Sequence, residues 1–225
     1  MFGPFSFMKT IVAISFYDDE PELFENALRS VIGADQIVCV DGPYSDWPHG
    51  GKLQSDESLI KIANACGAKV IKAPKIPWKH QIDKRNAYIT GENGDWYLTI
   101  DADETVQFID GHGWKTLKNF LVDSGNKAGA CAIKWNYAKH LGNKKGSYFT
   151  GRKLFKHVDG VHYKNHHAYL YDKYENRLKT ETNDVVVSKY TLLTFSGLVV
   201  NHHKTDRSQR RLDLQSRYYL TREHP

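Results

Sequence analysis

Two aspartates, Asp101 and Asp103, stand one residue apart at the end of an apolar run, in the stretch "DWYLTIDADETV" (95–106). In an extended chain, side chains two residues apart point the same way, so both carboxylates can face one partner. Two close carboxylates repel each other unless a proton or a cation lies between them. Hard oxygen ligands suit Mg²⁺ or Mn²⁺, and such an ion usually also holds phosphate oxygens. The stretch therefore indicates a metal and phosphate site, although aspartate is also common where a strand turns into a loop.

The strands and helices that must position these carboxylates can be predicted in the first half of the chain, because short apolar runs alternate there with stretches of helical spacing. The strand-like runs are residues 10–16, 36–41, 68–73 and 96–100, and the helix-like stretches are 18–33, 55–67 and 79–91. This alternation is typical of α/β proteins with a mostly parallel sheet and helices on both faces. Ligands of such sheets gather at the carboxyl ends of the strands. Asp41 and Asp101 both stand at such ends, so we expect them to face one cleft.

The pattern changes after residue 106. A helix is predicted near 113–123, and several strand-like runs follow, with the Gly- and Asn-containing segment 140–147 as a hairpin loop or flap between two of them. A last polar stretch, 205–220, has the composition of a surface helix. Because neither a repeat nor a low-complexity linker interrupts the sequence, we expect one domain over residues 1–225 with a β-rich C-terminal half.

Composition narrows the class of protein. The chain is 40% hydrophobic and 25% charged, so a disordered protein is excluded. A net charge of +5 fits an anionic ligand such as a nucleotide and is too weak to demand nucleic acid. Three cysteines lie far apart in apolar segments, as is typical of reduced thiols in a cytoplasmic protein. No run approaches the length of a membrane span and the N-terminus lacks a signal-peptide pattern, so we expect a cytoplasmic location.

The order of these segments along the chain resembles that of a known protein family. Asp41 at a strand end, then "DKRNAYITGEN" (83–93), then "GDWYLTIDADETV" (94–106) resemble the nucleotide-binding half of glycosyltransferases with the GT-A fold, in particular the broad family 2. The resemblance covers residues 9–106 well and extends more loosely to segments of 107–225. It implies a Rossmann-like, mostly parallel sheet, with a nucleotide-sugar-binding half followed by an acceptor-binding half.

The resemblance also implies roles for the aspartate pair. In that family the pair holds a divalent ion, Mn²⁺ or Mg²⁺, that bridges the diphosphate of a nucleotide-sugar, most often a UDP-sugar. Asp103 then corresponds to the direct ligand, and Asp101 to a ligand that also reaches the ribose.

Four further residues match the donor site of that family. Ser15 and Tyr17, after the first strand, would line the base pocket, and Asp41 would accept from the base or ribose. Arg85 would face the diphosphate, as suits a guanidinium. The structural alternatives are a turn-capping role for Asp41, a core position for Tyr17 and an exposed helical position for Arg85. The neighbouring Lys84 is predicted to face solvent.

Histidines supply the remaining candidates. Members of the family often carry a late histidine before a terminal helix that completes the metal shell, and "VVNHHKTDRSQRRL" (199–212) looks like that segment. Strand alternation lets one of His202 and His203 face the cleft, and we expect His202. No histidine spacing matches a standard zinc site.

An inverting transfer needs a base to take the proton of the acceptor hydroxyl. Many inverting relatives carry a glutamate after a histidine in this region, where the present chain reads "HYKNHHAYLYD" (162–172) and lacks it. His167 and Asp172 are the candidate bases, and a surface or acceptor-stacking role is the alternative for the histidines.

The acceptor stays open between a glycan and a hydroxylated base in DNA, because aromatic and cationic residues are interleaved after residue 134. Two rival functions also stay open. The sequence "IDADETV" fits the signature of phosphatases of the haloacid dehalogenase type, with Asp101 as nucleophile. A non-catalytic module that binds a nucleotide-sugar is the other.

Overall fold

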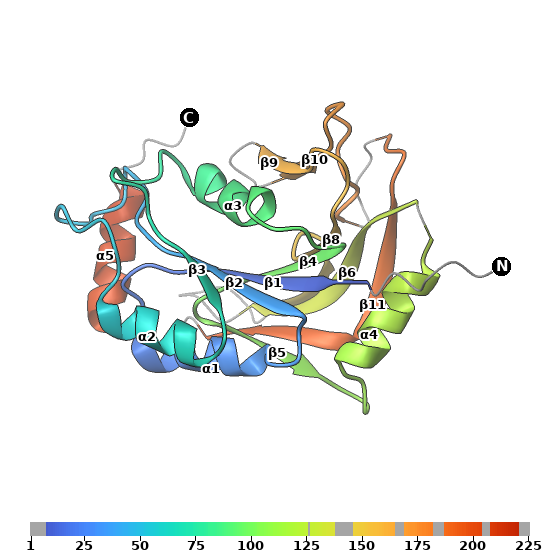
Figure 1. The fold of residues 1–225 in the computed structure, drawn as a ribbon, viewed down its shortest axis with the longest axis horizontal. Helices are drawn as coiled ribbons and strands as arrows, with labels where there is room; N and C mark the ends of the chain where they lie inside the picture. The colour runs from blue at the N-terminus through green and yellow to red at the C-terminus, as the bar shows by residue number, and fades with distance from the viewer. Residues whose placement is uncertain are drawn as a thin grey trace.

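The central strands of the fold are parallel and run side by side in the order β3, β2, β1, β4 (Figure 1). The computed structural model describes residues 8–125, 127–137, 146–164, 169–181, 187–203 and 208–220. The four strands are β1 (Thr10–Ser15), β2 (Gln36–Val40), β3 (Lys69–Ile71) and β4 (Trp96–Asp101). The helices between them are α1 (Pro21–Ser30), α2 (Glu57–Ala65) and α3 (Gln81–Thr90).

The C-terminal half extends the same sheet. Within the described residues, nine strands join in one sheet, whose order continues from β4 through β8, β6 and β11 to β5, with β7 paired to β6. β11 runs parallel to β6, whereas β8, β7 and β5 run antiparallel to their neighbours. The bounds are β5 (Glu104–Phe108), β6 (Ala128–Tyr137), β7 (Gly146–Thr150), β8 (Leu154–Lys156) and β11 (Thr191–His202). The remaining elements are α4 (Trp114–Asp123), the hairpin β9 (His162–Lys164) and β10 (Tyr169–Tyr171), and α5 (Gln209–Leu220).

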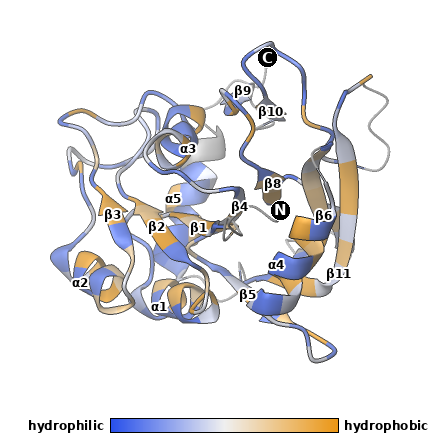
Figure 2. Ribbon diagram, turned by 45° about the vertical axis from the view of Figure 1, so that its right-hand side comes forward, coloured by the Kyte–Doolittle hydropathy of each residue, from blue (hydrophilic) through white to orange (hydrophobic). Residues whose placement is uncertain are grey.

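Alternation along the buried strand β1 divides the core into two layers. Val12 and Ile14 point to the face covered by α1, α2 and α4, and Ile11 and Ala13 point to the face covered by α3 and the β9–β10 hairpin. Hydrophobic residues accordingly run along β1 and β2, while α1 and α2 alternate between hydrophobic and hydrophilic positions (Figure 2). The predicted α/β class, with helices on both faces and a strand-rich second half, is confirmed.

Three details differ from expectation. β5 was not predicted, because "ETVQF" directly follows the aspartate pair and looks like its loop; pairing with β11 makes it a strand. Two of the strand-like runs after the predicted helix near 113–123, residues 185–195 and 198–203, are one strand in their described part, β11, with a register shift between Thr194 and Val199. α2 begins at Glu57, two residues after the start of the predicted helix-like stretch 55–67. Across the described residues, none of the helices combines the length and apolar character that crossing a membrane requires.

Lys84 is the clearest correction, since it is buried (2% exposed) instead of facing solvent. Its ammonium donates to the carbonyl oxygens of Phe16 and Gly42, at 2.6 and 2.7 Å. These carbonyls end β1 and β2, so the lysine ties α3 to the carboxyl edge of the sheet. Burial lowers the pKa of Lys84 to about 7, although Asp19 and Asp41 oppose the shift.

We expect the Lys84→Met variant to lose about 2–4 kcal/mol of unfolding free energy, because two buried carbonyls lose their donor. Denaturant unfolding measures the loss. Lys79→Met, at an exposed position just before α3, is the matched control and should change stability by less than about 0.5 kcal/mol. Equal stability of the two variants would show that the carbonyls find other donors.

Candidate functional site

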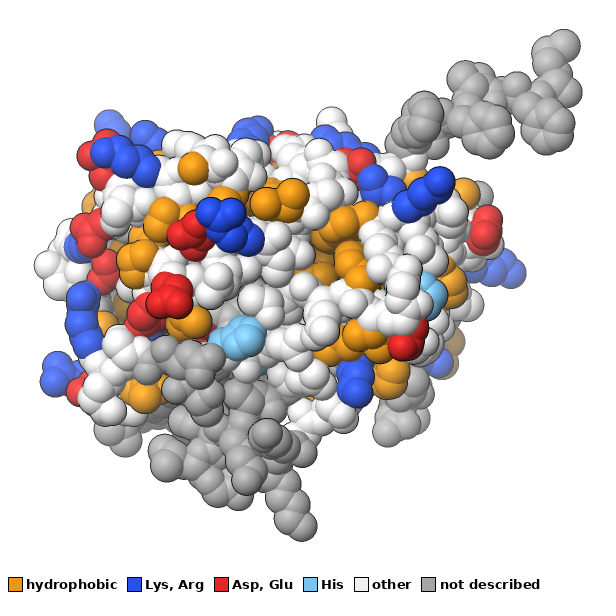
Figure 3. Space-filling model, turned by 90° about the horizontal axis from the view of Figure 1, so that it is seen from below, with side chains coloured by type: hydrophobic (Ala, Val, Ile, Leu, Met, Phe, Trp, Pro, Cys, Tyr) orange, Lys and Arg blue, Asp and Glu red, His pale blue; other side chains and the backbone are white. Residues whose placement is uncertain are grey.

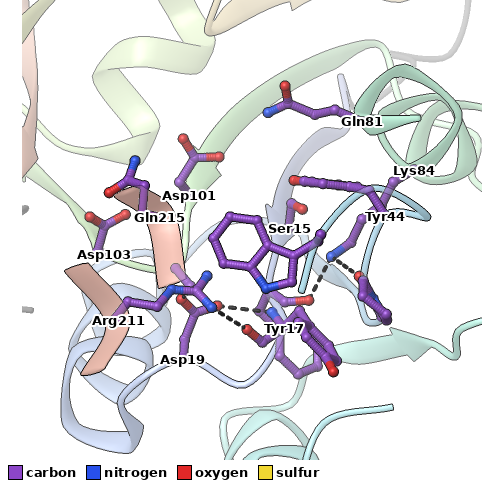
Figure 4. A pocket seen from close by; sticks show the side chains of 15 residues that line it. Ser15, Tyr17, Asp19, Tyr44, Gln81, Lys84, Asp101, Asp103, Arg211 and Gln215 are labelled. Carbon is purple, nitrogen blue, oxygen red and sulfur yellow. Dashed lines mark hydrogen bonds and ion pairs between the residues drawn. The ribbon is translucent and has the colours of Figure 1, made fainter. Parts of the chain in front are cut away.

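A cleft of about 200 Å³ opens at the carboxyl ends of β1, β2 and β4, where the chemistry-bearing residues gather (Figure 4). Segments far apart in sequence build it: the end of β1, the loop after β2, the start of α3, the turn after β4, and α5. The polar and aromatic lining residues are Ser15, Tyr17, Asp19, Tyr44, Trp47, Gln81, Lys84, Asp101, Asp103, Arg211 and Gln215.

The two predicted metal ligands line this cleft but have different partners. Asp101 faces Arg85, with 3.6 Å between Oδ1 and Nη2. Asp103 is buried and faces His202, with 2.9 Å between Oδ2 and Nε2. Burial alone would raise the pKa of Asp101, but the charges of Arg85 and Lys153 hold it below its usual range. Asp101 is therefore an ionised carboxylate at the mouth of a polar site.

The side chains of His202 and His203 point in different directions, as strand alternation requires. His202, the last residue of β11, reaches Asp103. His203 turns away, and its Nε2 lies 2.8 Å from Oγ1 of Thr105 while its backbone N–H donates to the carbonyl of Asp103. The structure thus places His202, and not His203, beside the aspartate pair.

Beneath the pair lies a fully buried carboxylate that the sequence analysis did not single out. Oε2 of Glu104 accepts from the backbone N–H of Asp101 at 2.9 Å and from the ammonium of Lys153 at 2.5 Å. Oε1 accepts from the indole of Trp135 at 2.9 Å. Three elements, β5, β6 and the approach to β8, therefore fix the turn that carries Asp101 and Asp103.

The donor set fits a divalent ion. Neighbouring ligands of an octahedral ion with bonds of about 2.1 Å lie about 3 Å apart, and Asp103 Oδ2 and His202 Nε2 are 2.9 Å apart. Among the described residues, no group of three or more His, Cys, Asp or Glu side chains is arranged to hold a metal. An ion here would need ligand oxygens from elsewhere, which is how Mg²⁺-type ions commonly bind phosphates.

The predicted donor-site residues are only partly brought together. Ser15 and Tyr17 line the cleft. The Tyr17 hydroxyl donates to the carbonyl of Lys52 at 2.7 Å, and burial, followed by the charge of Asp18, raises its pKa to about 12. Arg85 lies behind Asp101 and packs against the ring of Tyr163, 5.8 Å from its centroid.

Asp41 takes the capping role that was its structural alternative. Its carboxylate accepts from the backbone N–H of Gly42 at 2.7 Å and from the hydroxyl of Ser55 at 2.6 Å, and also from the backbone N–H of Ser55. It is 1% exposed and does not line the cleft. The prediction that it contacts the base or ribose is therefore not supported; Asp41 closes the loop between β2 and α2.

Neither candidate base is placed in the cleft. His167 lies outside the described residues. Asp172 is buried in the turn after β10, where it accepts from Lys189, Asn176 and Tyr190. Burial alone would raise the pKa of Asp172, but these hydrogen bonds hold it well below its usual range. A carboxylate stabilised as an anion by so many donors is a poor proton acceptor, so the assignment of Asp172 as base is wrong.

Several lining residues were missed by the sequence analysis. Asp19 and Arg211 form an ion pair at the cleft wall, with 2.9 Å between Oδ1 and Nη2. Tyr44 and Trp47 come from the loop "GPYSDWPHGG" (42–51), whose aromatic residues among turn formers were a usable signal. For Arg211 the signal was weaker, because a terminal helix with several arginines looks like an ordinary solvated surface.

The chain matches no protein-family model and no curated protein. Among solved structures it is similar to S. aureus TarS, at 17% identity and a TM-score of 0.44, over 60% of this chain and 23% of that one. The crystal structure of TarS residues 1–349 with UDP-GlcNAc shares 19% identity at a TM-score of 0.43, over 61% and 37% of the two chains. The mannosyltransferase PcManGT from Pyrobaculum calidifontis, with GDP-Man and Mn²⁺, shares 15% identity at a TM-score of 0.41, over 58% and 36%. The present chain thus spans well under two thirds of the length of these structures.

The Glu104 network generates a stability prediction. Glu104→Gln leaves the Lys153 ammonium, on a side chain 13% exposed, without a carboxylate. We expect a loss of about 2–4 kcal/mol in unfolding free energy. Lys153→Met is the reciprocal variant, and the double variant should lose less than the sum of the two because the charges act as a pair. Strictly additive losses would mean that the two side chains act independently.

Proposed function

We propose that the chain is a metal-dependent glycosyltransferase that moves a sugar from a nucleotide-sugar to an acceptor hydroxyl. The observation that carries the proposal is the grouping of Asp101, Asp103 and His202 at the carboxyl edge of the sheet, beside a cleft lined with aromatic side chains. The sequence resemblance to family 2 of the GT-A glycosyltransferases supports the same activity.

The charge balance of the cleft supports a requirement for a metal ion. Three lining carboxylates, Asp19, Asp101 and Asp103, stand against the guanidinium of Arg211 and the ammonium of Lys84, whose pKa of about 7 leaves it only partly charged, so the cleft is net anionic. A nucleoside diphosphate is strongly anionic and would be repelled by such a cleft. A divalent cation would offset this negative charge.

In the proposed site, Asp103 and His202 hold Mn²⁺ or Mg²⁺, with Asp101 beside them. When bound, the ion neutralises the departing nucleoside diphosphate as a Lewis acid. Glu104 keeps the Asp101–Asp103 turn in place through the Asp101 backbone N–H.

The aromatic side of the cleft suits the nucleoside. Tyr17, Tyr44 and Trp47 line the cleft together with Ser15 at the end of β1. Aromatic side chains stack on nucleobases regardless of which base is present, so the structure supports a nucleotide and the choice of UDP rests on the resemblance alone.

An inverting transfer needs a base, and His167 stays the candidate for it. We propose a glycan acceptor. On the face shown in Figure 3, basic and acidic side chains of the described residues are interspersed, and a single-sign basic patch of the kind that DNA attracts is not seen there. Salt-sensitive binding of DNA at low ionic strength would favour the hydroxylated-base alternative.

Asp101 as a phosphatase nucleophile is the weaker alternative. It needs a lysine bound to the nucleophile and a second acidic pair for Mg²⁺, whereas the cation paired with Asp101 is Arg85 and the ammonium of the nearby Lys153 is bound to Glu104. In the described part of the chain, Asp103 is paired with His202 and Glu104 is buried under Lys153 and Trp135.

The first test is a thermal-shift panel of UDP, GDP, dTDP and CMP, each with and without Mn²⁺. A ligand that binds only the native state raises its stability, by about 2.7 kcal/mol at a hundredfold excess over Kd. We expect one nucleoside diphosphate to raise Tm only with the metal, which would also identify the base. A shift with Mg²⁺ and beryllofluoride but with no nucleotide would favour the phosphatase.

Asp103→Asn tests the metal site. We expect the variant to fold, because one of several close carboxylates has been neutralised, and to lose the Mn²⁺-dependent shift and sugar transfer. Asp123→Asn, at an exposed position ending α4, should behave like the wild type. Transfer at the wild-type rate by Asp103→Asn, or by wild-type protein in EDTA, would refute the proposed role.

A further inference from the structure

The wall of the cleft opposite α3 is supplied by the C-terminal helix. Arg211 and Gln215 stand one helical turn apart on α5, and both side chains line the cleft together with Asp101 and Asp103 (Figure 4). The proposed donor site is therefore incomplete without a helix that begins more than 190 residues after β1 ends.

Three consecutive acidic residues hold that helix in place. Asp18, Asp19 and Glu20 follow β1, and each binds one residue at the start of α5. Arg210 pairs with Asp18 at 2.7 Å, Arg211 pairs with Asp19 at 2.9 Å, and the backbone N–H of Ser208 donates to Glu20 at 3.1 Å. The segment 18–20 thus acts as an acidic latch on the basic start of α5.

Within this latch the guanidinium of Arg211 is held on three sides. Its Nη1 donates to the carbonyl of Tyr17 at 3.0 Å, its Nη2 faces Asp19, and its Cζ lies 4.8 Å from the ring centroid of Trp47. The side chain is 15% exposed. These two polar contacts use two N–H donors, and a guanidinium carries five. A flat, fixed guanidinium with further donors is well suited to a phosphate.

Other basic side chains near the cleft are bound to groups of the protein or lie outside the cleft. The ammonium of Lys84 donates to two backbone carbonyls. Arg85 lies behind Asp101 and against Tyr163. Arg210, on a side chain 75% exposed, pairs with Asp18 and does not line this cleft. Of the basic residues in the described part of the chain, Arg211 is the one best placed to meet a ligand anion.

We propose that Arg211 is a phosphate-binding residue of the donor site, positioned by Asp19, Tyr17 and Trp47, and that donor binding in turn strengthens the docking of α5. The proposal rests on the proposed function for the identity of the ligand. It adds the residue that recognises the phosphates and the element that responds to them. Because binding and docking are coupled, each must favour the other by the same factor.

The deciding experiment measures Kd by calorimetry in the presence of Mn²⁺ for UDP, uridine and inorganic pyrophosphate. We expect Arg211→Ala to weaken UDP and pyrophosphate at least about tenfold, the loss of a charge-assisted hydrogen bond to phosphate, and uridine less than about twofold. Arg217→Ala removes the same charge from an exposed position of α5 outside the latch, where an exposed charge contributes little, and should change all three by less than about threefold. Arg211→Lys should recover part of the loss.

The outcomes separate this inference from the proposed function. If the wild type binds UDP and Arg211→Ala binds it within threefold, the inference is overturned and the function stands. If the wild type binds pyrophosphate but no nucleotide, and Arg211→Ala loses pyrophosphate, the phosphate site stands and the function falls. If the wild type binds neither, both fall. A cooperative unfolding transition and a wild-type circular dichroism spectrum of Arg211→Ala without ligand confirm that the comparison is between folded proteins.

Amide hydrogen exchange in α5 tests the reciprocal effect. UDP with Mn²⁺ should slow exchange in α5 several-fold in the wild type and in Arg217→Ala, and should leave it unchanged in Arg211→Ala. Exchange that is slowed equally in all three proteins would assign the protection to another contact, and no slowing in the wild type would refute the coupling.

Discussion

The position of β1 between β2 and β4 is the constraint on which the rest of the structure depends. β1 is buried on both faces and hydrogen-bonded on both edges, and its register sets Ser15 beside Val40 on one side and beside Asp101 on the other. The ends of three parallel strands therefore lie level with one another. The residues of the cleft follow those ends in the chain or reach them from α3, which packs on β1, and from α5, which binds the segment after β1.

The charged groups around the cleft are arranged as pairs with different degrees of burial. Glu104 with Lys153 and Asp103 with His202 lie deep, Asp19 with Arg211 forms the wall, and Asp101 with Arg85 stands at the mouth. Buried ions are costly unless they are paired and hydrogen-bonded, so this concentration is not explained by stability alone. Such a concentration of perturbed charged groups in a cleft is typical of functional sites.

Much of the fold could be predicted from local sequence patterns. The helical spacing of α1 to α4 and the apolar runs of β1 to β4 are properties of short windows, and they predicted elements within a few residues of the observed bounds. The aspartate pair also followed from local rules of strand ends, whereas His202 was expected from the family resemblance, with alternation allowing one of the two histidines to face the cleft. The roles of Asp41, Lys84 and Asp172 did not follow from local rules, because the groups that hydrogen-bond to each side chain are distant in the sequence or lie in a loop. Lys84, for example, binds carbonyls 68 and 42 residues away, and the local sequence "DKRNAY" gives no information about these partners.

The acidic latch between residues 18–20 and α5 has a consequence for biosynthesis. Its ion pairs join residues 192 positions apart in the chain, among the most distant contacts in the described structure. The central strands can pair while the polypeptide is still being made, but the cleft wall forms only after Arg211 has left the ribosome. Until then Asp19 and Glu20 lack the α5 partners that bind them in the folded protein, whereas Asp18 can already pair with Lys52. The wall of the cleft is thus completed later than the pairing of the central strands.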